Sequence, residues 1–297
     1  MTGRTLQWER DGADWPNSRA SRFMRVANVH WHVQELGEGP TLLLIHGTGA
    51  STHSWRSLAP YLARHLRVIM PDLPGHGFTG NFGSDRLSLP RMAHSLDQLL
   101  RRLDLQPALA VGHSAGAAIL IRMCLDGQVV PSGLVSLNGA LQPFNGLAGQ
   151  VFPLMANVLF LNPLVPRVFS WSARDRARVE RLIRNTGSRL DDKGIDLYQR
   201  LFRSPRHVAS ALGMMANWDL KALLRDLPRL NTPLLLVVGA NDRAVPPATS
   251  RQIQNLVPSA DLVSLPELGH LAHEEQPAAV ADLILQMARR VNVLPPA

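Results

Sequence analysis

The chain has 297 residues, of which 45% are hydrophobic and 18% are charged, and its formal net charge is +8. This composition is typical of a soluble globular protein and excludes a disordered chain or a collagen-like repeat. A disulfide scaffold is excluded as well, because Cys124 is the only cysteine. The length allows one large α/β domain or two smaller ones.

Apolar runs of strand length alternate with longer segments of helical period along most of the chain. We expect strands at residues 29–33, 41–45, 66–70, 108–111, 134–137, 233–238 and 261–264, and helices at 54–65, 90–103, 114–125, 247–256 and 277–290. This alternation predicts an α/β fold with a mostly parallel central sheet flanked by helices. In the first strand, His30 and His32 share one face and predict an edge strand with polar residues directed outward.

The alternation breaks between residues 140 and 218, which read as several helices punctuated by five prolines. We interpret this stretch as a helical lid inserted into one core domain, formed by residues 1–139 and 219–297. From Arg167 to Arg206 there are eleven basic residues against five acidic ones. Such a patch favours anionic partners, namely carboxylate substrates, acidic protein surfaces or lipid headgroups, although a solvated helical face explains it about equally well. Nucleic acid is not expected, because no recognition motif accompanies the arginines.

The sequence contains no segment that is expected to cross a membrane. Residues 1–21 mix acidic and basic side chains without an apolar core, which is unlike a secretory signal and favours a cytoplasmic protein. The most apolar stretch, residues 151–166, is interrupted by prolines and asparagines and is shorter than the roughly 20 residues of a transmembrane helix. Peripheral contact with a membrane surface remains open.

The pentapeptide Gly-His-Ser-Ala-Gly at residues 112–116 lies between an apolar strand-like run and a long aliphatic helix-like run. This context predicts a strand-to-helix turn that exposes the hydroxyl of Ser114 in strained backbone geometry. Gly112 and Gly116 are expected there because neighbouring backbone leaves no room for a side chain. We therefore take Ser114 as the candidate nucleophile.

A reactive serine needs a base and a third group that orients the base. Asp242 follows the expected strand at 233–238, and His270 follows the next one. The order Ser, Asp, His places all three side chains at the carboxyl ends of strands. Taken singly, Asp242 is also compatible with an ordinary turn and His270 with a locally bonded loop histidine.

An oxyanion hole requires two backbone N–H groups directed at the developing negative charge. Ala115, directly after the serine, is the first candidate donor. The second is Thr48 in the segment His-Gly-Thr-Gly at residues 46–49, with Gly49 close by, although two glycines after a strand are equally typical of a tight turn.

No cofactor and no metal site are expected. Residues 75–80 match a dinucleotide fingerprint, but residues 81–84 are turn-forming where that fingerprint requires a helix. Neither lysine follows a glycine, so a phosphate-binding loop is absent. His273 stands three residues after His270, which is already assigned to the serine, and a metal pair there is improbable.

Residues 46–49, 72–77 and 112–116, together with the Asp242 turn and the His270 loop, match the α/β hydrolases in order and spacing over nearly the whole chain. Residues 8–12, 15–16, 46–55, 137–140 and 143–144 more narrowly resemble the magnesium-chelatase accessory proteins (BchO type) of bacteriochlorophyll biosynthesis. The first resemblance implies a hydrolase fold with a serine triad. The second implies a role at or near magnesium insertion into protoporphyrin, without specifying a reaction.

Two functions follow as expectations. The first is a serine hydrolase of ester-type bonds, in which Ser114, His270 and Asp242 react and Thr48 and Ala115 hold the oxyanion. Its substrate is a small molecule, and the pathway resemblance suggests a porphyrin carboxylate bound by lid aromatics and arginines, with contacts from Gly49, His113 and Phe144. The second is a non-catalytic accessory protein that binds a tetrapyrrole or docks on magnesium-chelatase subunits.

Overall fold

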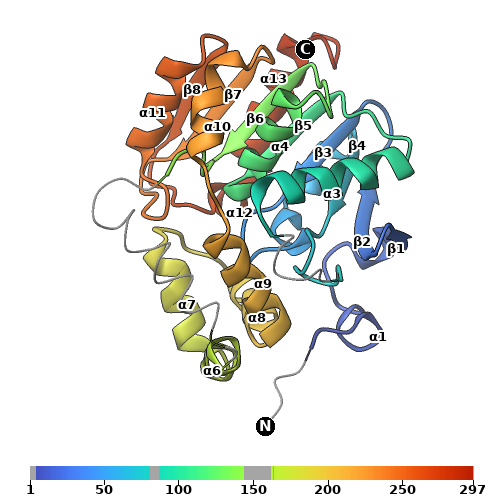
Figure 1. The fold of residues 1–297 in the computed structure, drawn as a ribbon, viewed down its shortest axis with the longest axis vertical. Coiled ribbons are helices and arrows are strands. Elements are labelled where there is room, and N and C mark those ends of the chain that lie inside the picture. The colour runs from blue at the N-terminus through green and yellow to red at the C-terminus, as the bar shows by residue number, and fades with distance from the viewer. Residues whose placement is uncertain (1–4, 81–86, 144–161, 163, 297) are drawn as a thin grey trace.

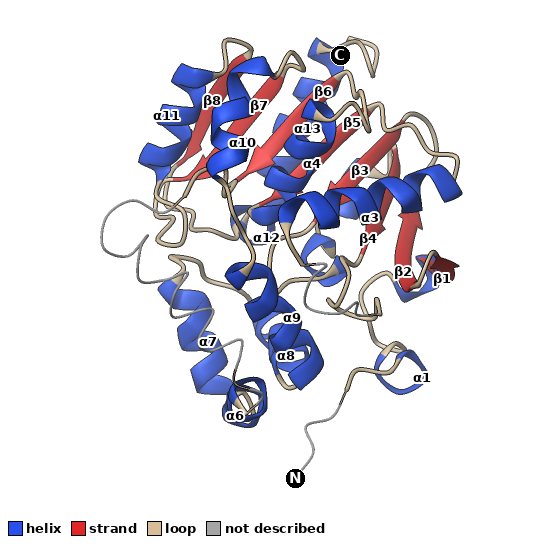
Figure 2. Cartoon of the chain, viewed as in Figure 1, coloured by secondary structure: helices blue, strands red, loops and turns tan. Residues whose placement is uncertain are grey.

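The computed structural model describes residues 5–80, 87–143, 162 and 164–296. Its centre is an eight-stranded sheet in the order β1-β2-β4-β3-β5-β6-β7-β8 (Figures 1 and 2). The antiparallel pairs are β1 with β2 and β2 with β4, and every other neighbouring pair is parallel, which confirms the mostly parallel sheet predicted from the sequence. The strands are β1 (Ser21–Val26), β2 (Val29–Leu36), β3 (Thr41–Ile45), β4 (Arg67–Pro71), β5 (Leu109–His113), β6 (Gly133–Leu137), β7 (Leu234–Gly239) and β8 (Ala260–Leu265).

Helices cover both faces of this sheet. One face packs against α3 (Leu89–Arg102), α4 (Ala115–Leu125), α10 (Lys221–Asp226) and α11 (Pro247–Leu256), and the other against α2 (Ala59–Leu62) and α13 (Pro277–Arg290). A hydrophobic core lies on each face of the sheet, the first against α3 and α4 and the second against α2 and α13. Successive side chains of a strand point to opposite faces, so Leu43 lies in the first core and Leu42 in the second. The short elements are α1 (Trp8–Asp11), α12 (Ala272–Glu275), η1 (Ser18–Ala20), η2 (Thr52–Trp55) and η4 (Leu227–Arg229).

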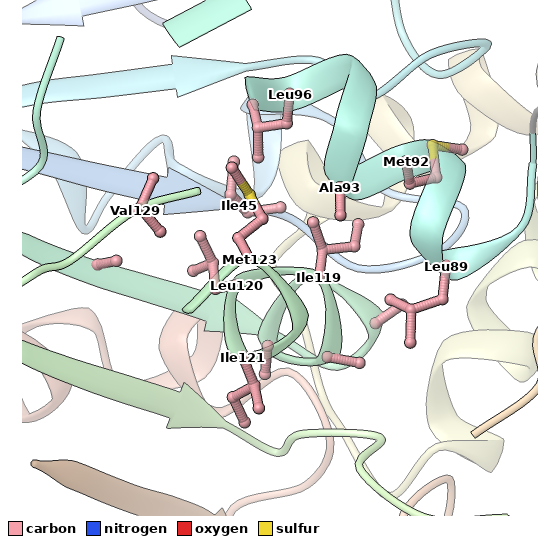
Figure 3. Close-up of a cluster of buried hydrophobic side chains, with 14 of the residues drawn as sticks. Ile45, Leu89, Met92, Ala93, Leu96, Ile119, Leu120, Ile121, Met123 and Val129 are labelled. Carbon is pink, nitrogen blue, oxygen red and sulfur yellow. The ribbon is translucent and has the colours of Figure 1, made fainter. Parts of the chain in front are cut away.

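The helix α3 illustrates how the sequence determines these elements. Pro90 lies in its first turn, where the missing N–H costs nothing. Its buried apolar residues, Met92, Ala93, Leu96, Leu99 and Leu100, recur at helical spacing on one face. Figure 3 shows this face packed against α4 in the first core.

The amino-terminal strand β1 was not predicted, and its presence changes the environment of β2. Because β1 covers β2, the prediction that β2 is an edge strand was wrong. His30 is exposed, but His32 is fully buried, with Nδ1 2.7 Å from Asp72 Oδ2 and Nε2 3.0 Å from Ser21 Oγ. Because both ring nitrogens have a hydrogen-bond partner, His32 can be buried, and a polar residue in this strand therefore does not indicate a solvent-exposed face.

Four further helices come between β6 and β7 in the chain, in the region where a lid was predicted. They are α6 (Val165–Ser172), α7 (Arg176–Asn185), α8 (Asp192–Phe202) and α9 (Pro205–Ala216), and we call them the cap helices. Figure 1 shows them grouped away from the sheet, at the end of the molecule that also carries α1. The division into a core (1–139 and 219–297) and a lid (140–218) remains a prediction. Within the described ranges, no helix has the length and apolar character needed to cross a bilayer.

Candidate active site

Ser114 occupies the turn between β5 and α4, and its backbone is in a conformation that few residues adopt. The φ and ψ angles are 51° and −116°. Hydrogen bonds hold the strained residue in place, because its N–H donates to Leu137 O at 2.9 Å and its carbonyl accepts from Ala117 N and Ala140 N. A strained backbone conformation that several hydrogen bonds hold in place is typical of functional sites.

The two glycines of the pentapeptide have the steric role expected from the sequence. A Cβ at Gly112 would lie 2.4 Å from Ala117 N, and a Cβ at Gly116 would lie 2.1 Å from Ile45 O. Both contacts are with backbone atoms, which cannot move aside independently. The turn is therefore restricted to glycine at these positions.

Asp242 and His270 form a buried hydrogen-bonded pair. Asp242 Oδ2 lies 2.8 Å from His270 Nδ1, and its Oδ1 accepts from Ala244 N and Val245 N at 2.8 Å each. Asn138 Nδ2 donates to the same Oδ2, also at 2.8 Å. Because a carboxylate only accepts, Nδ1 carries a proton, and in the neutral ring the lone pair is then on Nε2, which is the tautomer required of a general base.

Ser114 and His270 lie in one neighbourhood without a direct bond. Among the residues that the structure describes, neither Ser114 Oγ nor His270 Nε2 makes a hydrogen bond. The residue next to the serine, His113, donates from Nε2 to His270 O at 2.9 Å, and the two imidazole rings are 4.7 Å apart between centroids. Hydrogen bonds between a nucleophile and its base are commonly long before substrate is bound and shorten in the complex.

The two expected oxyanion donors are free to bind an acceptor. Neither the amide of Thr48 nor that of Ala115 has a hydrogen-bond partner in the described parts of the chain. Ala115 is the first residue of α4, where amides have no partner within the helix. The loop that carries Thr48 lies against Ser114, since a Cβ at Gly47 would be 3.0 Å from Ser114 Cβ.

Behind this loop, a buried polar network fixes the segment at residues 72–77. His46 donates from Nδ1 to Gly47 O at 2.8 Å and accepts at Nε2 from Leu73 N at 2.9 Å. Asp72 Oδ1 accepts from Thr52 N at 2.7 Å. Burial alone would raise the pKa of Asp72, but the adjacent His32 and the hydrogen bonds to the carboxylate hold it well below its ordinary value. The network joins the loop at residues 46–49 to the sheet.

The three predicted substrate contacts lie in different environments. Gly49 has a φ of +78°, and its carbonyl accepts from His207 Nε2 at 3.0 Å. The His113 ring is buried between His270 and His273, and burial holds its pKa well below the ordinary histidine value. Phe144 lies outside the described residues. Contact of these residues with a substrate remains a prediction.

The segment between the cap helices α7 and α8 contacts the loops that carry Asp242 and His270. Thr186 O accepts from Arg243 N at 3.0 Å and from His270 N at 3.4 Å, and Ser188 Oγ accepts from Leu271 N at 2.8 Å. Movement of the segment between α7 and α8 is therefore coupled to the position of His270. No local pattern in the sequence indicates this contact, because the partners are about 55 to 85 residues apart and neither Thr186 nor Ser188 belongs to a motif.

An ionic cluster around the buried side chain of Glu274 joins the same two parts of the molecule. Arg56 binds Glu274 and also Asp191 on the cap side, the latter at 2.8 Å. Tyr198 of α8 donates to Glu274 Oε1 at 2.8 Å. Burial raises the pKa of Glu274 to about 7, although Arg56 and the Tyr198 hydrogen bond act in the opposite direction. Glu274 lies four residues beyond His270 and was not predicted as part of the site.

In the described ranges, no cluster of three or more histidine, cysteine or acidic side chains has the arrangement of a metal site. His273 is fully buried against Trp55 and His113, and burial lowers its pKa to about 3. The ring is therefore neutral and packs as part of the interior behind His270.

Comparison with known proteins shows the family to which this fold belongs. Residues 40–277 match the model of the α/β hydrolase fold family. The magnesium-chelatase 30 kDa subunit of Rhodobacter capsulatus is 40% identical over 92% of this chain and 96% of its own length. A pimeloyl-acyl-carrier-protein methyl ester esterase of Vibrio vulnificus is 26% identical over 88% of this chain and 98% of its own length.

Among solved structures, a thermophilic esterase from Thermogutta terrifontis superimposes with a TM-score of 0.72 at 25% identity, covering 91% of this chain and 98% of the esterase. The family match spans most of the chain, and it includes the strands that carry Ser114, Asp242 and His270. The chain belongs to the α/β-hydrolase family, and it is a relative of the magnesium-chelatase 30 kDa subunit.

Proposed function

We propose that this protein is a serine hydrolase of ester-type bonds that acts in or near the magnesium-chelation step of bacteriochlorophyll biosynthesis. The observation that carries the catalytic part is the Asp242–His270 pair. Its carboxylate is fixed by Asn138 and two backbone amides, and it holds the proton of His270 on Nδ1. Nε2 then has its lone pair available for the hydroxyl of Ser114.

In the reaction, Ser114 Oγ attacks the ester carbonyl while His270 Nε2 takes its proton. The amides of Ala115 and Thr48 stabilise the resulting oxyanion, since neither has a hydrogen-bond partner among the described residues and both lie close to Ser114. His270 then gives its proton to the leaving alcohol, and an acyl-enzyme forms on Ser114. Water, deprotonated by His270, hydrolyses this intermediate and restores the serine.

The pathway assignment rests on the relative from Rhodobacter capsulatus, which is named as a magnesium-chelatase subunit. A porphyrin carboxylate that also carries an ester is a suitable substrate class, since it combines a broad apolar face with carboxylates that arginines bind. Phe169 is half-buried in the cap, 5.8 Å from the ring of Phe202. Trp171, in contrast, is exposed, so the aromatic side chains of the cap do not all face one site.

Ester hydrolysis by the purified protein tests the catalytic part. We expect turnover of short p-nitrophenyl esters, and a loss of about 10⁶-fold in kcat in Ser114→Ala, as for other serine hydrolases that lose their nucleophile. Ser95→Ala is the matched control, because Ser95 Oγ bonds to Arg91 O within α3, on a helix that does not carry a candidate residue. Equal activity in Ser114→Ala and the wild type would refute the proposal.

A second function is favoured by the missing Ser114–His270 hydrogen bond together with the chelatase relative. In it, the protein is a non-catalytic accessory that binds a tetrapyrrole or docks on chelatase subunits. Pigment intermediates in a bacteriochlorophyll-producing host separate the two functions. Catalysis requires that a Ser114→Ala strain accumulate the same intermediate as a deletion strain, whereas normal pigments in Ser114→Ala alone would favour the accessory role.

A further inference from the structure

Large apolar side chains are exposed on and beside the cap helices α6 and α7. In the described part of the chain, Leu164, Val168 and Trp171 are 57%, 63% and 59% exposed, and Leu182 of α7 is 41% exposed. All six tryptophans are described, and Trp171 alone among them is exposed. Exposed aromatic and aliphatic residues that cluster in this way are characteristic of interaction sites.

The spacing of these residues places them on a single face of α6. Leu164, Val168 and Trp171 are four and three residues apart, which is the repeat of one helical face. The other face is attached to the protein, because Pro166 and Ser170 are buried there and Phe169 packs edge-on against Phe202. The stripe therefore points away from the protein core. We call Leu164, Val168 and Trp171 the α6 stripe.

Basic side chains flank the α6 stripe. In the sequence, Arg167 lies between Leu164 and Val168, and Arg174 follows Trp171 by three residues. Both arginines are exposed, and neither makes an ion pair with any described residue. Arg181, on the exposed side of α7, is likewise unpaired among the described residues. The neighbouring Asp175 is already engaged by Arg178 and by the amide of Ala177. The surface around the stripe is therefore positively charged.

The location of α6 makes this surface accessible to a flat partner. Figures 1 and 2 show α6 at the end of the molecule opposite the sheet, beyond α7 and α8. Three exposed apolar side chains make a face much smaller than the roughly 20 to 30 residues per partner of a stable protein interface. A short apolar face with tryptophan and flanking arginines is the composition of a helix that lies in a bilayer interface.

We propose that the α6 stripe is a peripheral anchor for an anionic lipid bilayer. Trp171, Val168 and Leu164 enter the boundary between headgroups and acyl chains, and Arg167 and Arg174 contact the headgroup phosphates. Binding of this kind orients the cap helices, which contact the loops of Asp242 and His270, toward the membrane. The proposal concerns a surface outside the candidate active site and does not depend on catalysis.

Vesicle sedimentation with the full chain tests the anchor. The probes are vesicles of phosphatidylcholine with 30% phosphatidylglycerol and vesicles of phosphatidylcholine alone. We expect binding to the anionic vesicles that weakens as salt is raised, and weak binding to the neutral ones. The double variant Arg167→Glu, Arg174→Glu is expected to bind anionic vesicles at least about 30-fold more weakly, since each basic residue near such a surface contributes about a factor of five.

Matched variants on the core separate an anchor from a general surface effect. Val168→Ser is compared with Val130→Ser, because Val130 is 81% exposed and far from the cap in sequence. The charge-reversal control is Arg251→Glu on α11, which is exposed and unpaired among the described residues. We expect Val168→Ser and Trp171→Ser to weaken binding and the two controls to retain it.

Three results would overturn the proposal. The first is absence of binding to anionic vesicles by the folded wild type, and the second is equal binding by the α6 variants and their controls. The third is that Trp171→Ser leaves vesicle binding unchanged but abolishes co-purification with magnesium-chelatase subunits, which would assign the face to a protein. Each of these readouts is obtained without measuring ester hydrolysis, so failure of the anchor and failure of the proposed catalysis are distinguishable.

Discussion

The two tyrosines of this chain provide a matched test of the ionic cluster between the cap and the core. Tyr198 is buried, and its hydroxyl donates to Glu274 Oε1 at 2.8 Å. Tyr61 is 38% exposed, and its hydroxyl has no partner among the described residues. The change Tyr→Phe removes one oxygen at each site and leaves the ring. The Arg64 contact above the ring of Tyr61, at 5.3 Å, is therefore kept.

The size of the effect follows from the charge of the acceptor. A hydrogen bond to an ionised group contributes about 1.5–3 kcal/mol, and a bond between neutral groups about 0.5–1.5 kcal/mol. Tyr198→Phe is therefore expected to lower the free energy of unfolding by about 2 kcal/mol when Glu274 is ionised. Tyr61→Phe is expected to change it by less than about 0.5 kcal/mol, as exposed substitutions usually do.

The pH dependence has a definite sign, because the pKa of Glu274 is raised from 4.5 to about 7 in the folded protein. The folded state binds a proton that the unfolded state releases, so this contribution to stability is complete below pH 4.5 and is lost as the pH rises to about 7. Its full size is roughly 3 kcal/mol. Loss of the Tyr198 hydrogen bond raises the pKa of Glu274 further, and the difference between Tyr198→Phe and the wild type should therefore be larger at pH 8 than at pH 5.

Urea unfolding followed by tryptophan fluorescence, at pH 5 and at pH 8, measures these differences. The reasoning requires a loss of about 2 kcal/mol for Tyr198→Phe at pH 8 and at most about 1 kcal/mol at pH 5. Equal small losses in both tyrosine variants, or a greater loss for Tyr198→Phe at the lower pH, would refute it.

Three further changes test the candidate site. Asp242→Asn should lower kcat for ester hydrolysis by about 10⁴-fold through the wrong His270 tautomer, with thermal stability as its control, and unchanged kcat would contradict the role of the acid. Asn138→Ala removes one hydrogen bond from the buried carboxylate of Asp242 and should cost about 1.5–3 kcal/mol in urea unfolding; a cost below 0.5 kcal/mol would mean that the contact is unimportant. Gly116→Ala places a Cβ 2.1 Å from Ile45 O and should destabilise the fold by more than about 1–3 kcal/mol, so a wild-type melting temperature would show that the turn can relax.

The parallel part of the sheet could be predicted because its strands are continuously apolar and its long helices begin at recognisable residues. The segments Pro247–Leu256 and Pro277–Arg290 form helices with the bounds expected from the sequence. β1 was missed because the residues of its sequence Ser-Arg-Phe-Met-Arg-Val are mostly only half-buried, so the run lacks the apolar signal of an interior strand. The burial of His32 depends on Asp72, which is 40 residues away, and no local pattern reveals such a partner.

The candidate site was predictable to the extent that it consists of motifs at strand ends. The pairing of Asp242 with His270 follows from the order of the strands, and the free amide of Ala115 follows from the start of a helix. Asn138 was not predicted as a site residue, although its amide binds Asp242. The cluster around Glu274 was missed because its members come from three separate parts of the chain and are joined only by the cap.

The central claim is that Ser114 is an activated nucleophile, and covalent labelling with a fluorophosphonate probe measures it most directly. Peptide mapping of the labelled wild-type protein should place the adduct on Ser114, and His270→Ala should react far more slowly while retaining its fold. A folded wild-type protein that acquires no adduct on Ser114, or that reacts no faster than His270→Ala, would contradict the claim.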